Sequence, residues 1–264
     1  MDKSQRMLFK REKNDHFDLL LYSDIGDREE QQDRIGWSLD EKAAMVAICD
    51  GMGGHAGGSI ASGLAVNCIV SSYQRHKHNI NAAWLLNCLK LADTDIASQT
   101  RENGKPLNAG STAVVVWISD ELLYWGSVGD SRAYLLRGCE FVQLTKDQTY
   151  QIVLDEKKAA GLLTDEQYSI EAQRGETLIS YLGIGNLNLI EYSVSPVRLR
   201  SGDRIIVMSD GLYKTVTDEK IQRILLNFKS GQEAAAALEE LSKKCAKKAN
   251  ESRDNTTVAI ISII

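Results

Sequence analysis

The segment that most constrains this chain is an apolar run that ends in an aspartate and opens into a glycine-rich loop. The run covers residues 43–49, Asp50 follows it, and five of the next eight residues are glycine. A short apolar run of this kind predicts a buried strand. Glycine lets the backbone turn sharply or approach a bound group closely. Asp50 is therefore predicted to stand at the end of a rigid strand beside open backbone, where proteins place ligand-binding groups.

Elsewhere the hydrophobic pattern predicts mainly strands, with helices in two pairs. Strands are predicted at 17–23, 35–39, 112–119, 122–128, 133–137, 141–144, 189–194, 204–209 and 256–263. Helices are predicted from residue 59, from about residue 81, at 218–228 after Thr217, and from a capping box at Ser230 and Glu233. Two packed sheets with helices outside satisfy this pattern. Residues 145–187 are more polar and are predicted to be an insertion that covers something.

Composition is that of an ordinary soluble protein, with 43% hydrophobic and 25% charged residues among 264. One compact domain over residues 1–264 is the simplest organisation. The net charge of −5 gives no reason to expect nucleic acid or an anionic membrane as a partner. The five cysteines form no C-x-x-C pair, so buried free thiols are expected rather than a zinc site or disulfides. No signal peptide or membrane-spanning run is visible, and we expect a cytoplasmic monomer.

Five aspartates share one setting, in that each stands where a predicted strand meets a tight polar loop. They are Asp33, Asp50, Asp130, Asp210 and Asp254. One aspartate in a turn is ordinary turn chemistry, but five together, two of them followed by glycine, favour a shared site. Carboxylates without paired cysteines are hard oxygen ligands that select Mg²⁺, Mn²⁺ or Ca²⁺. Because clustered carboxylates repel one another unless cations neutralise them, the sequence predicts a metal site.

Hard divalent ions held by carboxylates most often serve phosphoryl chemistry. Two such ions about 3.5–4 Å apart can share a hydroxide nucleophile and stabilise the leaving oxygen. An arginine nearby would hold the phosphate. Arg28 lies close in sequence to Asp33 and is the candidate, although its charged surroundings also fit a solvated surface residue.

The glycine loop also matches a relaxed dinucleotide-binding fingerprint, G-x-G-x-x-A beginning at Gly51. Asp50 would repel a pyrophosphate there. The acidic strand end expected about twenty residues further on is missing, because 70–75 is predicted to be helical. A nucleotide-binding oxidoreductase would also leave three of the other aspartates unexplained, and it is the less favoured interpretation.

Several longer motifs surround these residues. They are Ser23-Asp24-Ile25-Gly26-x-Arg28-x-x-Gln31-Gln32-Asp33, Cys49-Asp50-Gly51-Met52-Gly53-Gly54-His55, Gly110-Ser111-Thr112, Val128-Gly129-Asp130-Ser131-Arg132-Ala133-Tyr134, Leu144-Thr145-Lys146-Asp147, Ser209-Asp210-Gly211-Leu212 and Arg253-Asp254-Asn255-Thr256-Thr257-Val258. In content and order the chain resembles the metal-dependent protein serine/threonine phosphatases of type 2C, in their compact bacterial form. The resemblance covers about residues 17–264.

The resemblance implies an α+β fold, a four-layer α-β-β-α sandwich of two mostly antiparallel sheets flanked by helix pairs. The metals would lie at one end between the sheets, beside a flap formed by residues 145–187. The implied cofactors are two core Mn²⁺ or Mg²⁺ ions. Asp50 would bridge them, and the Gly51 carbonyl would bind the second ion.

The remaining aspartates have implied places around the same ions. Asp210 and Asp254 would complete the first site, and Asp33 would act on the second ion through water. Asp130 with Asp210 would hold a third, weaker ion. Lys214 stands at a place that is acidic in many members of the family.

Two residues have implied catalytic roles. Arg28 would bind the substrate phosphate. Animal members carry a histidine two residues after the bridging aspartate as a proposed general acid. This chain has Met52 there, and His55 is the nearest replacement, with a structural histidine as the alternative.

The function implied is metal-dependent hydrolysis of phosphoserine and phosphothreonine in proteins, by direct attack of a metal-bridging hydroxide. The partners would be phosphorylated protein substrates of a serine/threonine kinase. The alternative is a catalytically weak regulator of the same fold that binds phosphoproteins. Loss of a metal aspartate would indicate such a regulator, and all five aspartates are present.

Overall fold

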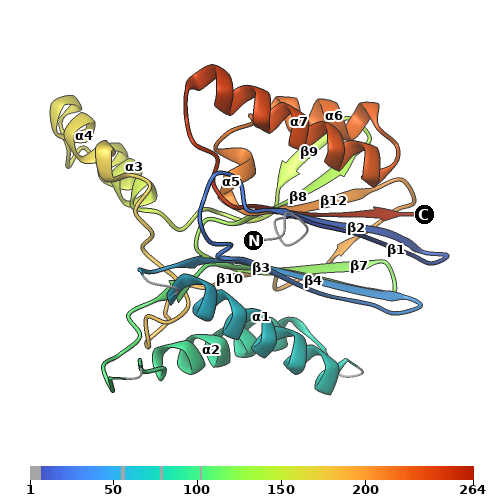
Figure 1. Ribbon diagram of the computed structural model, residues 1–264, viewed down its shortest axis with the longest axis horizontal. Helices are drawn as coiled ribbons and strands as arrows, with labels where there is room; N and C mark the ends of the chain where they lie inside the picture. Colours follow the sequence, from blue (N-terminus) through green and yellow to red (C-terminus); the bar gives the residue numbers. More distant parts are fainter. Residues whose placement is uncertain (1–6, 55–56, 78–79, 102) are drawn as a thin grey trace.

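Two β-sheets pack face to face and carry one pair of helices on each outer face (Figure 1). The computed structural model describes residues 7–54, 57–77, 80–101 and 103–264. Helices α1 (Gly57–His76) and α2 (Ala82–Ala97) cover one sheet, and α6 (Asp218–Asn227) and α7 (Gly231–Ala249) cover the other. The predicted α-β-β-α sandwich is confirmed.

Every strand pairing in the two sheets is antiparallel. The sheet under α6 and α7 runs in the order β1 (Met7–Lys13), β2 (Phe17–Asp24), β13 (Thr256–Ile263), β12 (Arg204–Met208), β8 (Arg132–Arg137), β9 (Glu140–Gln143). The other runs in the order β10 (Glu191–Tyr192), β7 (Leu122–Val128), β6 (Ala113–Ser119), β4 (Ala43–Met52), β3 (Asp33–Leu39), with β11 (Val197–Arg198) beside β7 and β5 (Gly110–Ser111) beside β4.

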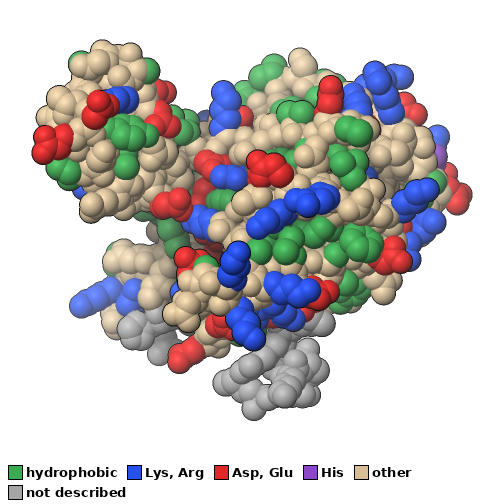
Figure 2. All heavy atoms as spheres, turned by 90° about the horizontal axis from the view of Figure 1, so that it is seen from above, with side chains coloured by type: hydrophobic (Ala, Val, Ile, Leu, Met, Phe, Trp, Pro, Cys, Tyr) green, Lys and Arg blue, Asp and Glu red, His purple; other side chains and the backbone are tan. Residues whose placement is uncertain are grey.

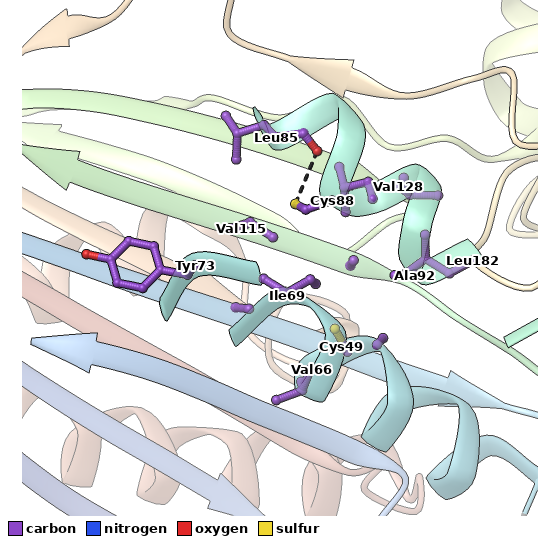
Figure 3. Close-up of a cluster of buried hydrophobic side chains, with 14 of the residues drawn as sticks. Cys49, Val66, Ile69, Tyr73, Leu85, Cys88, Ala92, Val115, Val128 and Leu182 are labelled. Atoms are coloured by element: carbon purple, nitrogen blue, oxygen red, sulfur yellow. Dashed lines mark hydrogen bonds between the residues drawn. The ribbon is translucent and has the colours of Figure 1, made fainter. Parts of the chain in front are cut away.

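Strand β4 is apolar because both of its faces are buried. Its alternate side chains Ala44, Val46 and Ile48 belong to the core between the sheets. The side chains between them belong to the core under α1 and α2, where Cys49 lies near Val66 and Ile69 of α1 (Figure 3). By this alternation the next residue, Asp50, falls on the face between the sheets.

The segment predicted to be the flap, residues 145–187, carries two helices outside the sandwich and returns to it at Leu182 and Leu187, which belong to the core under α1 and α2. The two helices are α3 (Tyr150–Ala159) and α4 (Asp165–Glu171), followed by the short helix η2 (Ala172–Arg174). Figures 1 and 2 show the flap helices as a knob beside the main body. Thr164 and Gln167 form a capping box at α4 that the sequence analysis did not identify.

Some local predictions were wrong. Ser230 precedes α7, but its side chain makes no capping hydrogen bond, and only its carbonyl joins the helix by accepting from the Ala234 N–H. Thr217 likewise makes no side-chain cap at α6. The strand predicted at 189–194 shortens to the two residues of β10, and directly after it Ser193 is bonded to the Trp125 backbone through its hydroxyl as well as its amide.

Two expectations from composition can be compared with the described residues. All five cysteines are free, but only Cys49 and Cys88 are buried, and Cys139 is exposed. Among the described residues, no helix is long and apolar enough to cross a membrane.

Candidate metal centre

Asp33 and Asp50 stand directly opposite each other on neighbouring strands. Asp33 begins β3, and its Cα partner in β4 is Asp50. Asp33 shares its strand face with Ile35 and Trp37, which pack against the core between the sheets. Both carboxylates therefore lie on the inner face of one sheet, at the end of the sandwich where β3 begins.

The Asp33 carboxylate is fully enclosed and only half satisfied. Its Oδ2 accepts a 2.7 Å hydrogen bond from the Ser209 hydroxyl, and its Oδ1 is buried without a hydrogen-bond partner. Burial raises the pKa of Asp33 to about 7, and the negative charge of Asp210 adds to the rise. An oxygen that is buried and unpaired costs free energy, so a cation at this position would stabilise it.

The backbone of Asp50 is fixed by the short strand β5 and the residue after it. Its N–H donates to the Thr112 hydroxyl at 3.0 Å, and its carbonyl accepts from the Thr112 N–H at 2.8 Å and from the Ser111 hydroxyl at 3.0 Å. Burial raises the pKa of Asp50 well above its ordinary value, and the charges of the other aspartates raise it further. Those neighbours are Asp33, Asp210, Asp130 and Asp254. The structure thus brings all five predicted aspartates into one electrostatic cluster.

Gly51 lies where a side chain could not fit. A Cβ there would stand 2.0 Å from the carbonyl oxygen of Gly58, and the Gly51 N–H donates to the Gln32 carbonyl at 3.1 Å. Strand β4 continues through Gly51 to Met52, two residues beyond the predicted strand end. Glycine is required here so that the start of α1 can approach β4 closely.

Asp210 follows a strand of the other sheet, Asp130 lies in the turn that links the two sheets, and one lysine joins them. Asp210 begins the short helix α5 (Asp210–Tyr213), which follows β12, and Asp130 lies in the turn between β7 and β8. The Lys214 Nζ lies 2.8 Å from Asp210 Oδ2 and 3.6 Å from Asp130 Oδ2. Burial and Asp210 raise the pKa of Asp130 to about 6, although Lys214 acts in the opposite direction.

Asp254 lies just before β13 and is paired with Arg28. The Arg28 Nη2 donates to Asp254 Oδ2 at 2.6 Å. The neighbouring Asn255 holds the loop that carries Arg28, since its side chain donates to the carbonyls of Ile25 and Glu30 and accepts from the Gln32 N–H. The guanidinium is thereby kept at the rim of the site.

A cleft of about 630 Å³ opens over this end of the sandwich. Its lining includes Arg28, Asp50, Gly51 and Asp254. Asp130 instead lines a second cleft of about 250 Å³, between the sandwich and the flap. His55 lies outside the described residues.

The donor atoms of these residues suit a divalent metal, although the carboxylates do not converge on one point in this structure. Within the described ranges, no three acidic, cysteine or histidine side chains stand close enough to hold an ion. Two of the aspartates are instead paired with Arg28 and Lys214. The fit rests on the unpaired Asp33 oxygen, an oxygen-only donor set, and raised pKa values that a cation would reverse.

Three supporting residues had no predicted role. Ser209 orients Asp33, Thr112 fixes Asp50, and Asn255 holds the Arg28 loop. Each lies within one of the quoted motifs, and for Ser209 and Asn255 the available signal was adjacency to Asp210 and Asp254. Their partners are distant in sequence, and adjacency alone does not identify them.

Comparison with known proteins agrees with the family resemblance of the sequence motifs. Residues 22–252 match the family model for protein phosphatase 2C. The chain is 30% identical over 223 residues to the serine/threonine protein phosphatase PstP of Mycobacterium tuberculosis, covering 84% of this chain and 41% of that protein. It is 29% identical over 253 residues to the protein phosphatase PhpP of Streptococcus pneumoniae, covering 93% of this chain and 97% of that one.

Solved structures agree in fold. The catalytic domain of the serine/threonine protein phosphatase PstP, in complex with two manganese ions, superposes with a TM-score of 0.70 at 27% identity. That match covers 94% of this chain and 99% of the other. The chain therefore belongs to the protein phosphatase 2C family.

Proposed function

We propose that this chain is a metal-dependent phosphatase that hydrolyses phosphoserine and phosphothreonine in proteins. One observation carries the proposal. Asp33 and Asp50 are opposed on neighbouring strands, with the charges of three further aspartates raising the pKa of Asp50. A fold rarely concentrates five carboxylates in this way unless cations neutralise them. Membership of the protein phosphatase 2C family supports the same reaction.

Two core Mn²⁺ or Mg²⁺ ions would be held mainly by Asp50. The Gly51 carbonyl and Asp33 would serve one ion, and Asp210 and Asp254 the other. The two manganese ions of the PstP catalytic domain support this number. A third ion at Asp130 and Asp210, which the resemblance implies, would have to share these carboxylates with Lys214.

The ions, when bound, activate a water molecule for attack and neutralise charge on the phosphoryl group. The chain itself supplies positioning. Arg28 lines the same cleft as Asp50 and would bind two phosphate oxygens through its guanidinium. Its Nη2 donates to Asp254, and a metal ion that drew Asp254 away would free this group for phosphate as well.

Further assignments rest on the resemblance. We propose His55 as the proton donor to the leaving serine or threonine oxygen. A phosphoprotein substrate fits the open 630 Å³ cleft, because a side chain carrying phosphate can enter it from solvent. We also propose that the protein is a cytoplasmic monomer, forms one catalytic domain over residues 1–264, and acts on substrates of a serine/threonine kinase.

The test is release of phosphate from a phosphothreonine peptide with Mn²⁺, with and without a chelator. We expect turnover with Mn²⁺ that the chelator abolishes and that restored Mn²⁺ recovers. Turnover that persists in full with chelator would refute the proposal. Absent turnover combined with tight peptide binding would support the phosphoprotein-binding regulator instead.

A further inference from the structure

Lys214 lies at the point where the sandwich, the metal centre and the flap meet. It follows α5 directly, and its backbone N–H donates to the Asp210 carbonyl at 3.0 Å. One helical turn therefore separates Lys214 from Asp210, which places both side chains on the same face of α5. The position of the ammonium is thus fixed by the same short helix that positions the aspartate.

Three carboxylates from three separate segments contact the ammonium. Asp210 Oδ2 and Glu176 Oε2 each lie 2.8 Å from Lys214 Nζ, and Asp130 Oδ2 lies 3.6 Å from it. Lysine has three donor hydrogens and no acceptor. The number of carboxylates therefore matches the number of hydrogens that the ammonium can direct at them.

The two aspartates of this group belong to the electrostatic cluster around Asp50. Their side chains are largely buried, with exposed fractions of 16% for Asp210 and 7% for Asp130. A divalent ion placed between them would either displace the ammonium or lie next to it. Like charges at such short range repel strongly where little water screens them. The ammonium and a third ion therefore compete for one position.

The contacts of Lys214 leave one carboxylate oxygen of Asp210 free to bind a core ion. Lys214 engages only Oδ2 of Asp210, so Oδ1 remains available to a core ion. Figure 2 shows acidic and basic side chains gathered in the hollow between the flap and the body. The contact with Glu176 brings the flap segment after η2 to this hollow, beside the second cleft.

We propose that the Lys214 ammonium takes the place of a third divalent cation in this chain. The metal centre then works with two ions, and its third positive charge is built into the protein. The inference rests on the proposed function, because it presupposes two core ions at Asp50. It makes Lys214 a positioning residue, which neutralises Asp130 and Asp210 without touching the substrate.

The test counts Mn²⁺ ions bound per chain, by equilibrium dialysis with metal analysis. Wild type should bind two ions. Lys214→Met should bind a third ion at least about tenfold more tightly than wild type does, because the competing charge is gone. Lys214→Arg should stay at two ions because it keeps the charge. Lys243→Met is the matched control, since Lys243 also pairs with an acidic residue four positions away, Glu239 on α7.

The outcomes separate this inference from the proposed function. Wild type that binds three ions, or folded Lys214→Met that stays at two, would overturn the role of Lys214 while leaving the phosphatase intact. Wild type that binds no Mn²⁺ and releases no phosphate would overturn the proposed function and this inference with it. If Lys214→Met does not fold, the wild-type and Lys214→Arg counts decide, because three ions in either contradicts the inference.

Discussion

Arg28 and Lys214 both place a positive charge on a proposed metal-binding carboxylate, but in different surroundings. In the described part of the chain, Arg28 has one ion pair, with Asp254, and its side chain is 56% exposed. Lys214 contacts three carboxylates, and its side chain is 39% exposed. An exposed single pair is worth about 0–1 kcal/mol. Arg28 can therefore change partners at little cost, whereas Lys214 is held from three sides.

This difference assigns the two cations different tasks. If Asp254 turned towards an ion, Arg28 would lose its partner and become available to phosphate in the same cleft. Metal binding and phosphate binding would then be coupled through Asp254. Lys214 would keep its partners, because it contacts only Oδ2 of Asp210 and leaves Oδ1 to a core ion. In this account Arg28 exchanges its carboxylate partner for phosphate, whereas Lys214 stays bound to its carboxylates.

The largest effect is expected from Asp50→Asn, which removes a carboxylate that neither cation pairs with. Turnover should fall by roughly a thousandfold or more, because several kcal/mol of metal-dependent stabilisation is lost. The metal-free variant should melt a few degrees higher than wild type, since burial raises the pKa of Asp50 and its charge is destabilising. Steady-state kinetics and calorimetry measure both. The control is Asp120→Asn in the turn at the far end of β6, and near-normal turnover in Asp50→Asn would exclude its role.

Arg28→Ala should have the next largest effect and separates the two cations directly. The kcat/KM for a phosphopeptide should fall about 10- to 100-fold, as expected for a lost charged hydrogen bond. Mn²⁺ binding should tighten at the same time, because Asp254 no longer has a competing partner. The matched control is Arg75→Ala, at the far end of α1. Unchanged Mn²⁺ affinity with reduced kcat/KM would show that Arg28 does not compete with metal.

Mn²⁺ affinity should rise from pH 5.5 to pH 7.5. Burial raises the pKa of Asp33 to about 7 and of Asp130 to about 6, and an ion that binds beside Asp33 at low pH must displace the proton of Asp33. Each displaced proton costs up to about tenfold in affinity per pH unit below the pKa. Titration calorimetry in buffers of different ionisation enthalpy counts the released protons, and an affinity that stays flat over this range would contradict the prediction.

The same shifts set the sign of the metal-free stability. Because the folded pKa of each carboxyl lies above its unfolded value, ionisation favours the unfolded chain. Metal-free stability should therefore fall as the pH rises from about 4 to 7. Lys214 does not titrate in this range, because contacts with Asp210 and Glu176 raise its pKa even though burial opposes the rise.

The smallest effect is expected from Glu176→Gln, which removes the flap's contact with Lys214. Glu176 is 79% exposed, so the pair contributes on the order of 0.5 kcal/mol. Hydrogen exchange in residues 150–176 should accelerate about twofold, with Mn²⁺ stoichiometry unchanged. Glu240→Gln is the control, because Glu240 pairs with Lys244 on α7, on the main body. Equal exchange in both variants would mean that the flap does not depend on Lys214.

Most of the fold could be predicted from the sequence because β4 and β13 are apolar on both faces. Only a layered structure can bury both faces of a strand. Asp50 was identified for a related reason, since it follows the apolar run of β4, whereas Asp33 was identified because it stands where a polar loop meets the partly exposed strand β3. The short helix α5 was missed because its four residues continue directly from β12 and give no periodic signal. The capping predicted at Ser230 failed because a motif shows which bonds are possible, whereas the local backbone decides which form.

The sequence could not predict which carboxylates pair with which basic side chains. Arg28 and Asp254 are 226 positions apart, and Lys214 meets Asp130 only because β12 and β8 are neighbours. The family resemblance implied that Arg28 would bind phosphate and that Lys214 departs from an acidic position. It could not show that each already holds a carboxylate of the metal centre.

The most direct measurement is anomalous diffraction at the manganese edge from crystals soaked in MnCl₂. We expect two peaks beside Asp50, Arg28 released from Asp254, and Lys214 Nζ still within hydrogen-bond distance of Asp210. A third peak between Asp130 and Asp210, with Lys214 displaced, would contradict the account. So would two peaks with Arg28 still paired to Asp254.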